Sequence, residues 1–146
     1  MEELRELFQK FARNFSMLDA TCCSRCCGED LSLIQSHILF EVRRRHLPSM
    51  QEVANALGVD VTTFSRQVKA LVEMGLVQTT QDPNDRRVKL LSLTEKGQDI
   101  ERQISDFMNR AICKILDRMT PFEQHVVISS LSLLNTAVRE AQIWSR

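Results

Sequence analysis

The sequence predicts a mainly α-helical fold with one small β-hairpin, completed by a helical dimerisation region built from both chain ends. Two observations lead to this fold class. Stretches at both ends of the chain repeat apolar residues at helical spacing. In the middle, two short helical patterns joined by a glycine-containing turn precede a charged turn between two short apolar stretches. With 146 residues, the chain is long enough for one domain with a sizeable core.

Charge and composition narrow the class of protein. The chain has 19 basic and 19 acidic residues, so a nucleic-acid partner must be argued from where the charges lie rather than from net charge. No apolar run approaches the roughly 18 residues that span a bilayer, and no signal peptide is recognisable, so we expect a cytoplasmic protein with no membrane partner. The five cysteines are then expected to be reduced thiols or metal thiolates rather than disulfides.

The first predicted helix runs from Met1 to about Leu18. Its apolar residues form a narrow seam, which fits docking against other helices, and we assign residues 1–20 to dimerisation. The cysteines and Gly28 are expected to interrupt the pattern. Asp30 is expected to cap a second helix, which ends in a basic run and is closed by Pro48. The apolar positions are Leu4, Phe8, Phe11, Phe15 and Leu18 in the first helix, and Leu31, Ile34, Ile38 and Val42 in the second.

Two short helices follow. Ser49 and Glu52 form a capping box that starts the third helix at Met50, and Gly58 ends it. Asp60 is a cap for a fourth helix through Met74, which Gly75 ends. At 100° per residue, the fourth helix collects one apolar face and, opposite to it, hydroxyl, guanidinium and ammonium groups that can bind base edges and phosphates in a major groove. The apolar face contains Val61, Phe64, Val68 and Leu71, and the polar face Thr62, Arg66 and Lys69, flanked by Thr63 and Ala70.

A β-hairpin is predicted from Leu76 to Thr80 and from Val88 to Leu93. Its tip, residues 82–87, reads Asp-Pro-Asn-Asp-Arg-Arg. Asp82 and Pro83 suit the first two positions of a type I turn, because proline presets φ and the aspartate can accept a backbone hydrogen bond. Such a turn would project two arginines into solvent.

Two long helices complete the chain. Thr94 is expected to cap the first of them, with Gly97 in its first turn at some cost in helix propensity. Residues 120–123, Thr-Pro-Phe-Glu, combine a capping box with proline at the first helical position and start the second. The apolar faces of these helices and of the first helix are longer than one small domain can cover, so we assign residues 100–146 to dimerisation as well.

The order of these elements resembles the MarR family of winged-helix transcription regulators. The resemblance covers nearly the whole chain and rests on the helix-turn-helix between Ser49 and Gly75, the Asp82–Arg87 tip, and the Leu-Thr-Glu-Lys-Gly restart at residues 93–97. It implies a winged helix-turn-helix DNA-binding region at residues 30–97. It also implies a homodimer that binds palindromic promoter DNA, usually represses, requires no cofactor, and releases DNA when it senses a small molecule, metal or oxidant.

The resemblance also assigns residues to DNA. The fourth helix becomes the recognition helix in the major groove, Arg86 or Arg87 enters the minor groove, and Asp85 holds that arginine in place. The full set of candidate DNA contacts is Ser49, Thr62, Thr63, Ser65, Arg66, Gln67, Lys69, Asp85, Arg86, Arg87 and Lys89.

Four cysteines lie outside the family pattern. Cys22, Cys23, Cys26 and Cys27 supply soft ligands for zinc, copper(I) or arsenite, and Cys113 is a further candidate ligand. Two alternatives are a dithiol switch, and cysteines that only fill space in a regulator that responds to a small molecule. His37, His46 and His125 are each isolated, and we expect them to be structural or exposed.

Other classes of protein fit less well. The Cys-x-x-Cys spacing occurs in thiol oxidoreductases, but the strand-helix-strand context of that motif is missing. The sequence also has neither a phosphate-binding glycine loop nor a nucleophile elbow. A winged helix that binds only proteins would not need the polar face of the fourth helix or the twin arginines. We therefore expect a DNA-binding regulator and no enzyme.

Overall fold

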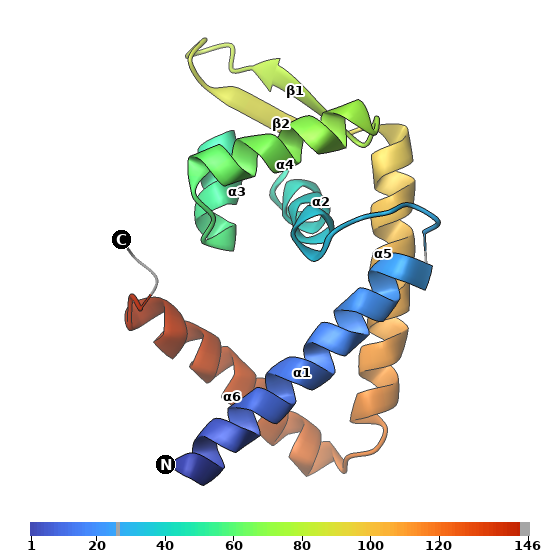
Figure 1. Ribbon diagram of the computed structural model, residues 1–146, viewed down its shortest axis with the longest axis vertical. Coiled ribbons are helices and arrows are strands. Elements are labelled where there is room, and N and C mark those ends of the chain that lie inside the picture. Colours follow the sequence, from blue (N-terminus) through green and yellow to red (C-terminus); the bar gives the residue numbers. More distant parts are fainter. Residues whose placement is uncertain (26, 144–146) are drawn as a thin grey trace. The chain divides into compact units, whose positions relative to one another are not determined.

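The computed structural model describes residues 1–25 and 27–143, except for the side chains of residues 20 and 23–25. Its elements are α1 (Glu2–Arg25), α2 (Leu33–Arg45), α3 (Met50–Leu57), α4 (Val61–Glu73), β1 (Val77–Gln81), β2 (Lys89–Leu93), α5 (Glu95–Leu116) and α6 (Pro121–Glu140), shown in Figure 1. The two strands pair antiparallel, with Val77 opposite Leu93 and Gln81 opposite Lys89. This confirms the predicted fold class of helices with one hairpin. The chain divides into two compact units, residues 1–108 and 109–146.

The hydrophobic core of the first unit lies among α2, α3, α4, the hairpin and the first turns of α5. Ile38, Phe64, Leu71, Leu76 and Leu91 are completely buried there. Burying a side chain of this size stabilises the fold by about 1.5–3 kcal/mol relative to leaving it exposed. The core therefore fixes α4 by one face against α2 and β1.

The caps predicted for three helices are confirmed. Ser49 and Glu52 exchange hydrogen bonds at the start of α3, and Asp60 Oδ1 accepts from the backbone N–H of Thr63 at 2.9 Å at the start of α4. Gly58 ends α3 in the left-handed region, with φ 63°. Thr120 caps α6, with Pro121 in the first turn. These elements were predictable because each cap is made by residues within three positions of one another.

The prediction that the cysteines interrupt the first helix was wrong. Helix α1 continues through Cys22 to Arg25. Cys22 lies four residues after Leu18, so it extends the apolar seam, and a cysteine in such a position behaves as a small hydrophobic residue. It is only 1% exposed and belongs to the core. The next glycine, Gly28, has φ 68° and lies in the connection to α2.

The predicted start of the second helix was also wrong, whereas its end in the basic run before Pro48 was predicted correctly. Its cap is Ser32 rather than Asp30, because Ser32 and Gln35 form a reciprocal capping box and Asp30 has no such partner three residues on. The helix ends at Arg45, ahead of Pro48, and His46 and Leu47 both take positive φ angles.

Val61 was wrongly placed in the apolar face of the fourth helix. It is the first residue of α4 and is 51% exposed, whereas Phe64, Val68 and Leu71 are buried as predicted. The helical period gives the direction of a side chain, but a residue in the first turn is buried only if another segment covers that end of the helix.

Close packing, rather than helix propensity, explains why position 97 is a glycine. Thr94 Oγ1 accepts from the backbone N–H of Gly97 at 3.0 Å, which confirms Thr94 as the cap of α5. A Cβ atom at position 97 would lie 1.9 Å from the carbonyl oxygen of Leu76. The close approach of the two backbones therefore requires glycine.

The second unit contains the end of α5 and helix α6. Gln124 Nε2 donates to the carbonyl oxygens of Leu116 and Met119 and so ties the start of α6 to the preceding turn. No residue of α6 is fully buried. Within the described residues, no helix is both long and apolar enough to cross a membrane.

Candidate nucleic-acid interface

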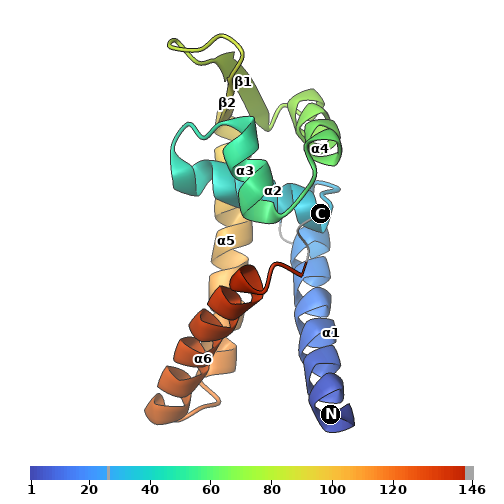
Figure 2. The ribbon, with the colours of Figure 1, turned by 90° about the vertical axis from the view of Figure 1, so that its left-hand side faces the viewer.

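Helix α4 presents its polar residues to solvent. Thr62, Thr63, Ser65, Arg66 and Lys69 are exposed, and Gln67 is partly buried. The opposite face of α4 is buried in the core, so the helix is held rigidly while its polar side chains stay accessible. Figure 2 shows α4 and the hairpin at the same end of the first unit, and α4 contacts β1. A helix fixed in this way is suited to insertion into a major groove.

The hairpin tip is ordered by its two aspartates. Asp82 Oδ1 accepts from the backbone N–H of Asn84 at 2.7 Å, as expected for an aspartate at the start of a turn. The backbone N–H of Val88 donates to the carbonyl of Asp85 at 2.9 Å, so the hydrogen-bonded turn spans residues 85–88. The predicted turn position was therefore wrong: Asp82 binds through its side chain, and Asp85 begins the closed turn.

Asp85 pairs with Arg87 and not with Arg86. The guanidinium of Arg87 places Nε 3.2 Å from Asp85 Oδ1 and Nη2 3.4 Å from Oδ2, and the backbone N–H of Arg87 also donates to Oδ1 at 3.0 Å. The hydrogen bonds from the Arg87 side chain and then from its backbone hold the pKa of Asp85 below its usual range. The Arg87 side chain nevertheless remains 91% exposed. Arg86 is exposed and has no ion pair with any described residue.

Ser49 and Lys89 occupy the base of the hairpin. Ser49 Oγ accepts from the backbone N–H of Glu52 at 3.1 Å, so its hydroxyl already caps α3. The backbone of Ser49 also bridges to Leu90, and Leu91 N–H donates to the carbonyl of Pro48 at 2.8 Å. Lys89 is exposed at the first position of β2. These contacts join the start of α3 to the hairpin, and the roles of Ser49 and Lys89 toward DNA stay predictions.

The structure describes three of the five cysteines with their side chains. The Sγ of Cys22 is buried and donates to the carbonyl of Ile104 on α5 at 3.8 Å, while Cys27 is partly buried, with Sγ 3.9 Å from the carbonyl oxygen of Glu29. Cys113 is exposed in the second unit. Cys26 and the side chain of Cys23 lie outside the described residues. Among the residues that are described, no three His, Cys, Asp or Glu side chains gather as metal ligands, and the three histidines are exposed.

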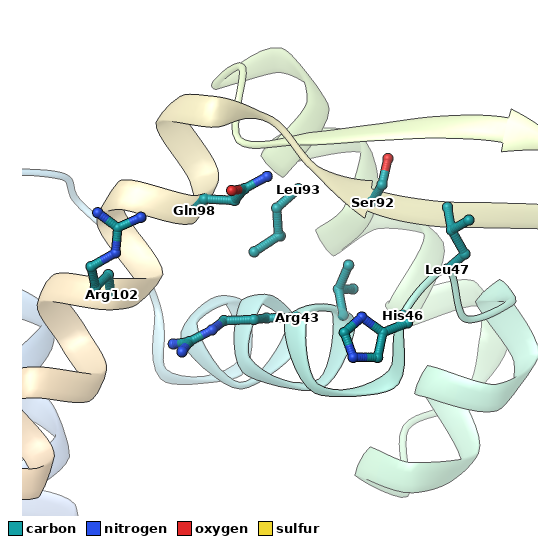
Figure 3. A pocket seen from close by; sticks show the side chains of 8 residues that line it. Arg43, His46, Leu47, Ser92, Leu93, Gln98 and Arg102 are labelled. Atoms are coloured by element: carbon teal, nitrogen blue, oxygen red, sulfur yellow. The ribbon is translucent and has the colours of Figure 1, made fainter.

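A pocket of about 490 Å³ lies between the end of α2, the end of β2 and the start of α5 (Figure 3). Arg43 on its wall pairs with Glu101, which is only 1% exposed and also accepts from Ser105 Oγ at 2.5 Å. Arg102 Nη1 lies 3.3 Å from Asp99 Oδ1. The lining residues are Val42, Arg43, His46, Leu47, Ser92, Leu93, Gln98 and Arg102.

Sequence reasoning missed one pair of residues at the end of α4. Lys96 Nζ lies 2.7 Å from Glu29 Oε1 and 3.4 Å from the carbonyl oxygen of Met74, which caps α4. The Leu-Thr-Glu-Lys-Gly restart at residues 93–97 predicted only the beginning of a helix. No local signal could have paired Lys96 with a residue 67 positions earlier, because that contact arises from tertiary packing.

Comparisons with known proteins agree with this geometry. The sequence profile of the family described as Winged helix DNA-binding domain matches residues 31–97. The HTH-type transcriptional regulator YfiV of Bacillus subtilis (strain 168) is 23% identical over 113 residues, which cover 77% of this chain and 71% of that protein. FabT of Streptococcus pneumoniae, solved in complex with DNA, has a TM-score of 0.88 at 22% identity, covering 97% of this chain and 99% of that chain. The MarR protein from Peptoclostridium difficile DA00132 has a TM-score of 0.79 at 25% identity, covering 99% of this chain and 90% of that chain.

The fold and the exposed face of α4 thus define a winged helix DNA-binding domain. Residues 31–97 match that domain, and the chain shares its fold with a solved MarR protein, in agreement with the resemblance read from the hairpin tip and the restart at residues 93–97. The relative from Bacillus subtilis is described as a transcriptional regulator, and the domain matched at residues 31–97 is described as DNA-binding.

Proposed function

We propose that the protein is a homodimeric repressor that binds palindromic promoter DNA and releases it in response to chemistry at the cysteine segment, residues 22–27. The observation that carries the DNA-binding part is the exposed polar face of α4 on a helix whose other face is buried. Arg66 and Gln67 are the side chains best suited to hydrogen-bond base edges, and Lys69 to contact phosphate.

Arg87 is the proposed minor-groove residue. A narrow minor groove attracts an inserted arginine, and an arginine already oriented by Asp85 loses less rotamer freedom when it inserts. Arg86 lacks such a partner among the described residues and is assigned to phosphate contact. The hairpin of β1 and β2 then positions the protein on the duplex, and α4 reads the base sequence.

The proposed homodimer is supported by apolar side chains that a single chain leaves exposed. On α1, Leu4, Phe8 and Phe11 are 53%, 47% and 42% exposed and lie along one seam. On α6, Phe122 and Leu133 are 75% and 72% exposed. Continuous apolar faces of this kind mark protein–protein contacts. In a two-fold dimer, the two recognition helices would meet half-sites about one helical turn apart, which explains the expected palindrome.

The sensing part rests on the number and spacing of the thiols. Thiolates are the ligands that zinc, copper(I) and arsenite prefer, and four thiols within six residues offer enough of them. Cys27 is partly accessible, whereas Cys22 is packed against α5. A ligand that recruited Cys22 would draw it away from Ile104 and so disturb the packing of α1 on α5. Peroxide offers a second route, in which two thiols and one peroxide give a disulfide and two waters.

One titration tests this proposal. The reduced protein binds a fluorescent duplex that it has itself selected from a random library, and zinc, copper(I), arsenite or hydrogen peroxide is then added. We expect release of DNA, and we expect Cys23→Ser, Cys26→Ser and Cys27→Ser combined with Cys22→Ala to abolish it. Cys113→Ser is the matched control and should respond like the wild type. If no addition changes DNA affinity, the sensing function is wrong while DNA binding stands.

The pocket at the end of α2 favours a second candidate, a small organic effector. Its walls combine apolar side chains with Arg43, Arg102, His46 and Gln98, which suits an amphipathic ligand with a polar group. Glu101 and Asp99 already pair with the two arginines, so most of the positive charge there is neutralised. A screen for compounds that raise the melting temperature, repeated on Arg102→Ala, separates this candidate from sensing by the cysteines.

A further inference from the structure

The exit of the recognition helix is clamped to the first turn of α5. Thr94 Oγ1 donates to the carbonyl of Gly75 at 2.6 Å, and the backbone N–H of Thr94 donates to the carbonyl of Leu76 at 3.0 Å. Gly97 packs so closely on Leu76 that no side chain fits between them. The C-terminal end of α4 therefore follows the position of residues 94–97.

Lys96 adds a charged contact to this junction. Its Nζ lies 3.4 Å from the carbonyl oxygen of Met74 at the end of α4, where the helix dipole places partial negative charge. The same Nζ lies 2.7 Å from Glu29 Oε1. The Glu29 side chain is 27% exposed and the Lys96 side chain 53% exposed, so the pair is only partly screened by water.

Glu29 belongs to the connection that follows the cysteines. Its carbonyl oxygen accepts from the backbone N–H of Leu31 at 3.0 Å and lies 3.9 Å from the Sγ of Cys27. A displacement of Cys27 would therefore move Glu29. Glu29 in turn sets where Lys96 lies against the end of α4.

We propose that Lys96 is a positioning residue for the recognition helix, and that Glu29 connects the cysteine segment to it. The first statement concerns DNA recognition alone. The second rests on the proposed sensing function, and it identifies the path by which chemistry at residues 22–27 changes DNA affinity.

A direct contact of Lys96 with a DNA phosphate is the competing explanation, and charge separates the two. If Lys96 binds phosphate, Lys96→Met weakens binding equally on all sequences and lowers the salt slope by about 0.9. Glu29→Gln would then strengthen binding, because it removes a negative charge beside that lysine. If Lys96 positions α4, both substitutions reduce the preference for the selected duplex over a scrambled duplex of the same composition.

The experiment measures affinity for the selected and scrambled duplexes by fluorescence anisotropy at several salt concentrations. For Lys96→Met and for Glu29→Gln, we expect a loss of about two- to fivefold in the ratio of the two affinities, the range typical of an exposed or partly exposed ion pair. The double variant should lose no more than the worse single variant, because the two residues act as one unit. Additive losses, or the phosphate pattern described above, would overturn the positioning role.

Lys10 and Glu6 supply the matched control. They form an ion pair of the same length, 2.7 Å, within α1. Lys10→Met and Glu6→Gln should leave the affinity ratio unchanged. Circular dichroism checks that each variant keeps its helical content.

A last arm adds arsenite or hydrogen peroxide to the wild type and to Glu29→Gln. We expect the wild type to release the selected duplex. Glu29→Gln should need at least threefold more of either reagent for the same release, because it lacks the ion pair between residue 29 and Lys96. Equal release by both proteins would overturn the role of Glu29. If the wild type itself does not respond, the sensing function and the path through Glu29 both fail, while the affinity ratios of Lys96→Met still decide its positioning role.

Discussion

At the hairpin tip, residues 82–87, single side chains fix the orientation of an arginine. Asp85 accepts hydrogen bonds from both the backbone and the side chain of Arg87, two residues away. The resemblance of the hairpin tip to the MarR family implied a held arginine, and these local bonds give it a physical basis. The resemblance could not predict which arginine is held, since that choice depends on the turn that closes between residues 85 and 88.

The two wing arginines should therefore differ. Arg87→Ala should lower affinity for every duplex by about tenfold or more, because it removes a pre-oriented group from the minor groove. Arg86→Ala should cost less and should mainly reduce the salt slope, as expected for a phosphate contact. Anisotropy titrations on the selected and scrambled duplexes measure both effects. Equal losses for the two variants would contradict the assignment of Arg87.

At the scale of the elements, the sequence predicted features that depend on neighbouring residues and missed features that depend on packing between distant segments. The capping boxes at Ser49 and Thr120 and the left-handed Gly58 were predicted because each depends on neighbours in the chain. The exposure of Val61 and the burial of Cys22 were not, because both depend on which distant segment covers them. The same holds for Gly97, whose requirement comes from the backbone of Leu76.

Gly97→Ala should destabilise the junction between α4 and α5. The new Cβ would overlap the carbonyl oxygen of Leu76, so one backbone must move, at a cost of about 1–3 kcal/mol for overpacking. Urea unfolding followed by circular dichroism measures this cost. Gln103→Ala, at an exposed position of the same helix, is the control and should change stability by less than about 0.5 kcal/mol. A Gly97→Ala variant as stable as this control would show that the junction adapts.

The capping carboxylates predict how stability changes with pH. Backbone hydrogen bonds from Ser49, Thr63 and Thr120 hold the pKa values of Glu52, Asp60 and Glu123, respectively, below their usual range. A depressed pKa in the folded state contributes stability above the pKa of the unfolded chain and loses it as pH falls through the folded value. The urea midpoint should therefore stay level from pH 7 to about 5 and fall below about pH 4.5.

Glu123→Gln provides the internal check of this pH dependence. A glutamine at position 123 can still accept from the backbone N–H of Thr120 but does not titrate in this range. Its acid-induced loss of α6 helicity should be smaller than that of the wild type. If the two proteins lose helicity in parallel, the capping carboxylate does not contribute to the acid transition.

At the scale of the whole molecule, one chain leaves apolar side chains of α1 exposed, as it does on α6. Each buried phenylalanine contributes about 1.5–3 kcal/mol, and a two-fold interface would bury it twice. Phe8→Glu should therefore give a monomer in light scattering, because it places two charges in that interface. Gln9→Glu adds the same charge at the next, exposed position and should remain dimeric.

Since a monomer reaches one half-site only, Phe8→Glu should bind the palindrome no better than a single half-site. A dimeric Phe8→Glu protein with normal affinity for the palindrome would exclude this part of α1 from the interface and leave α6 as the dimerisation element.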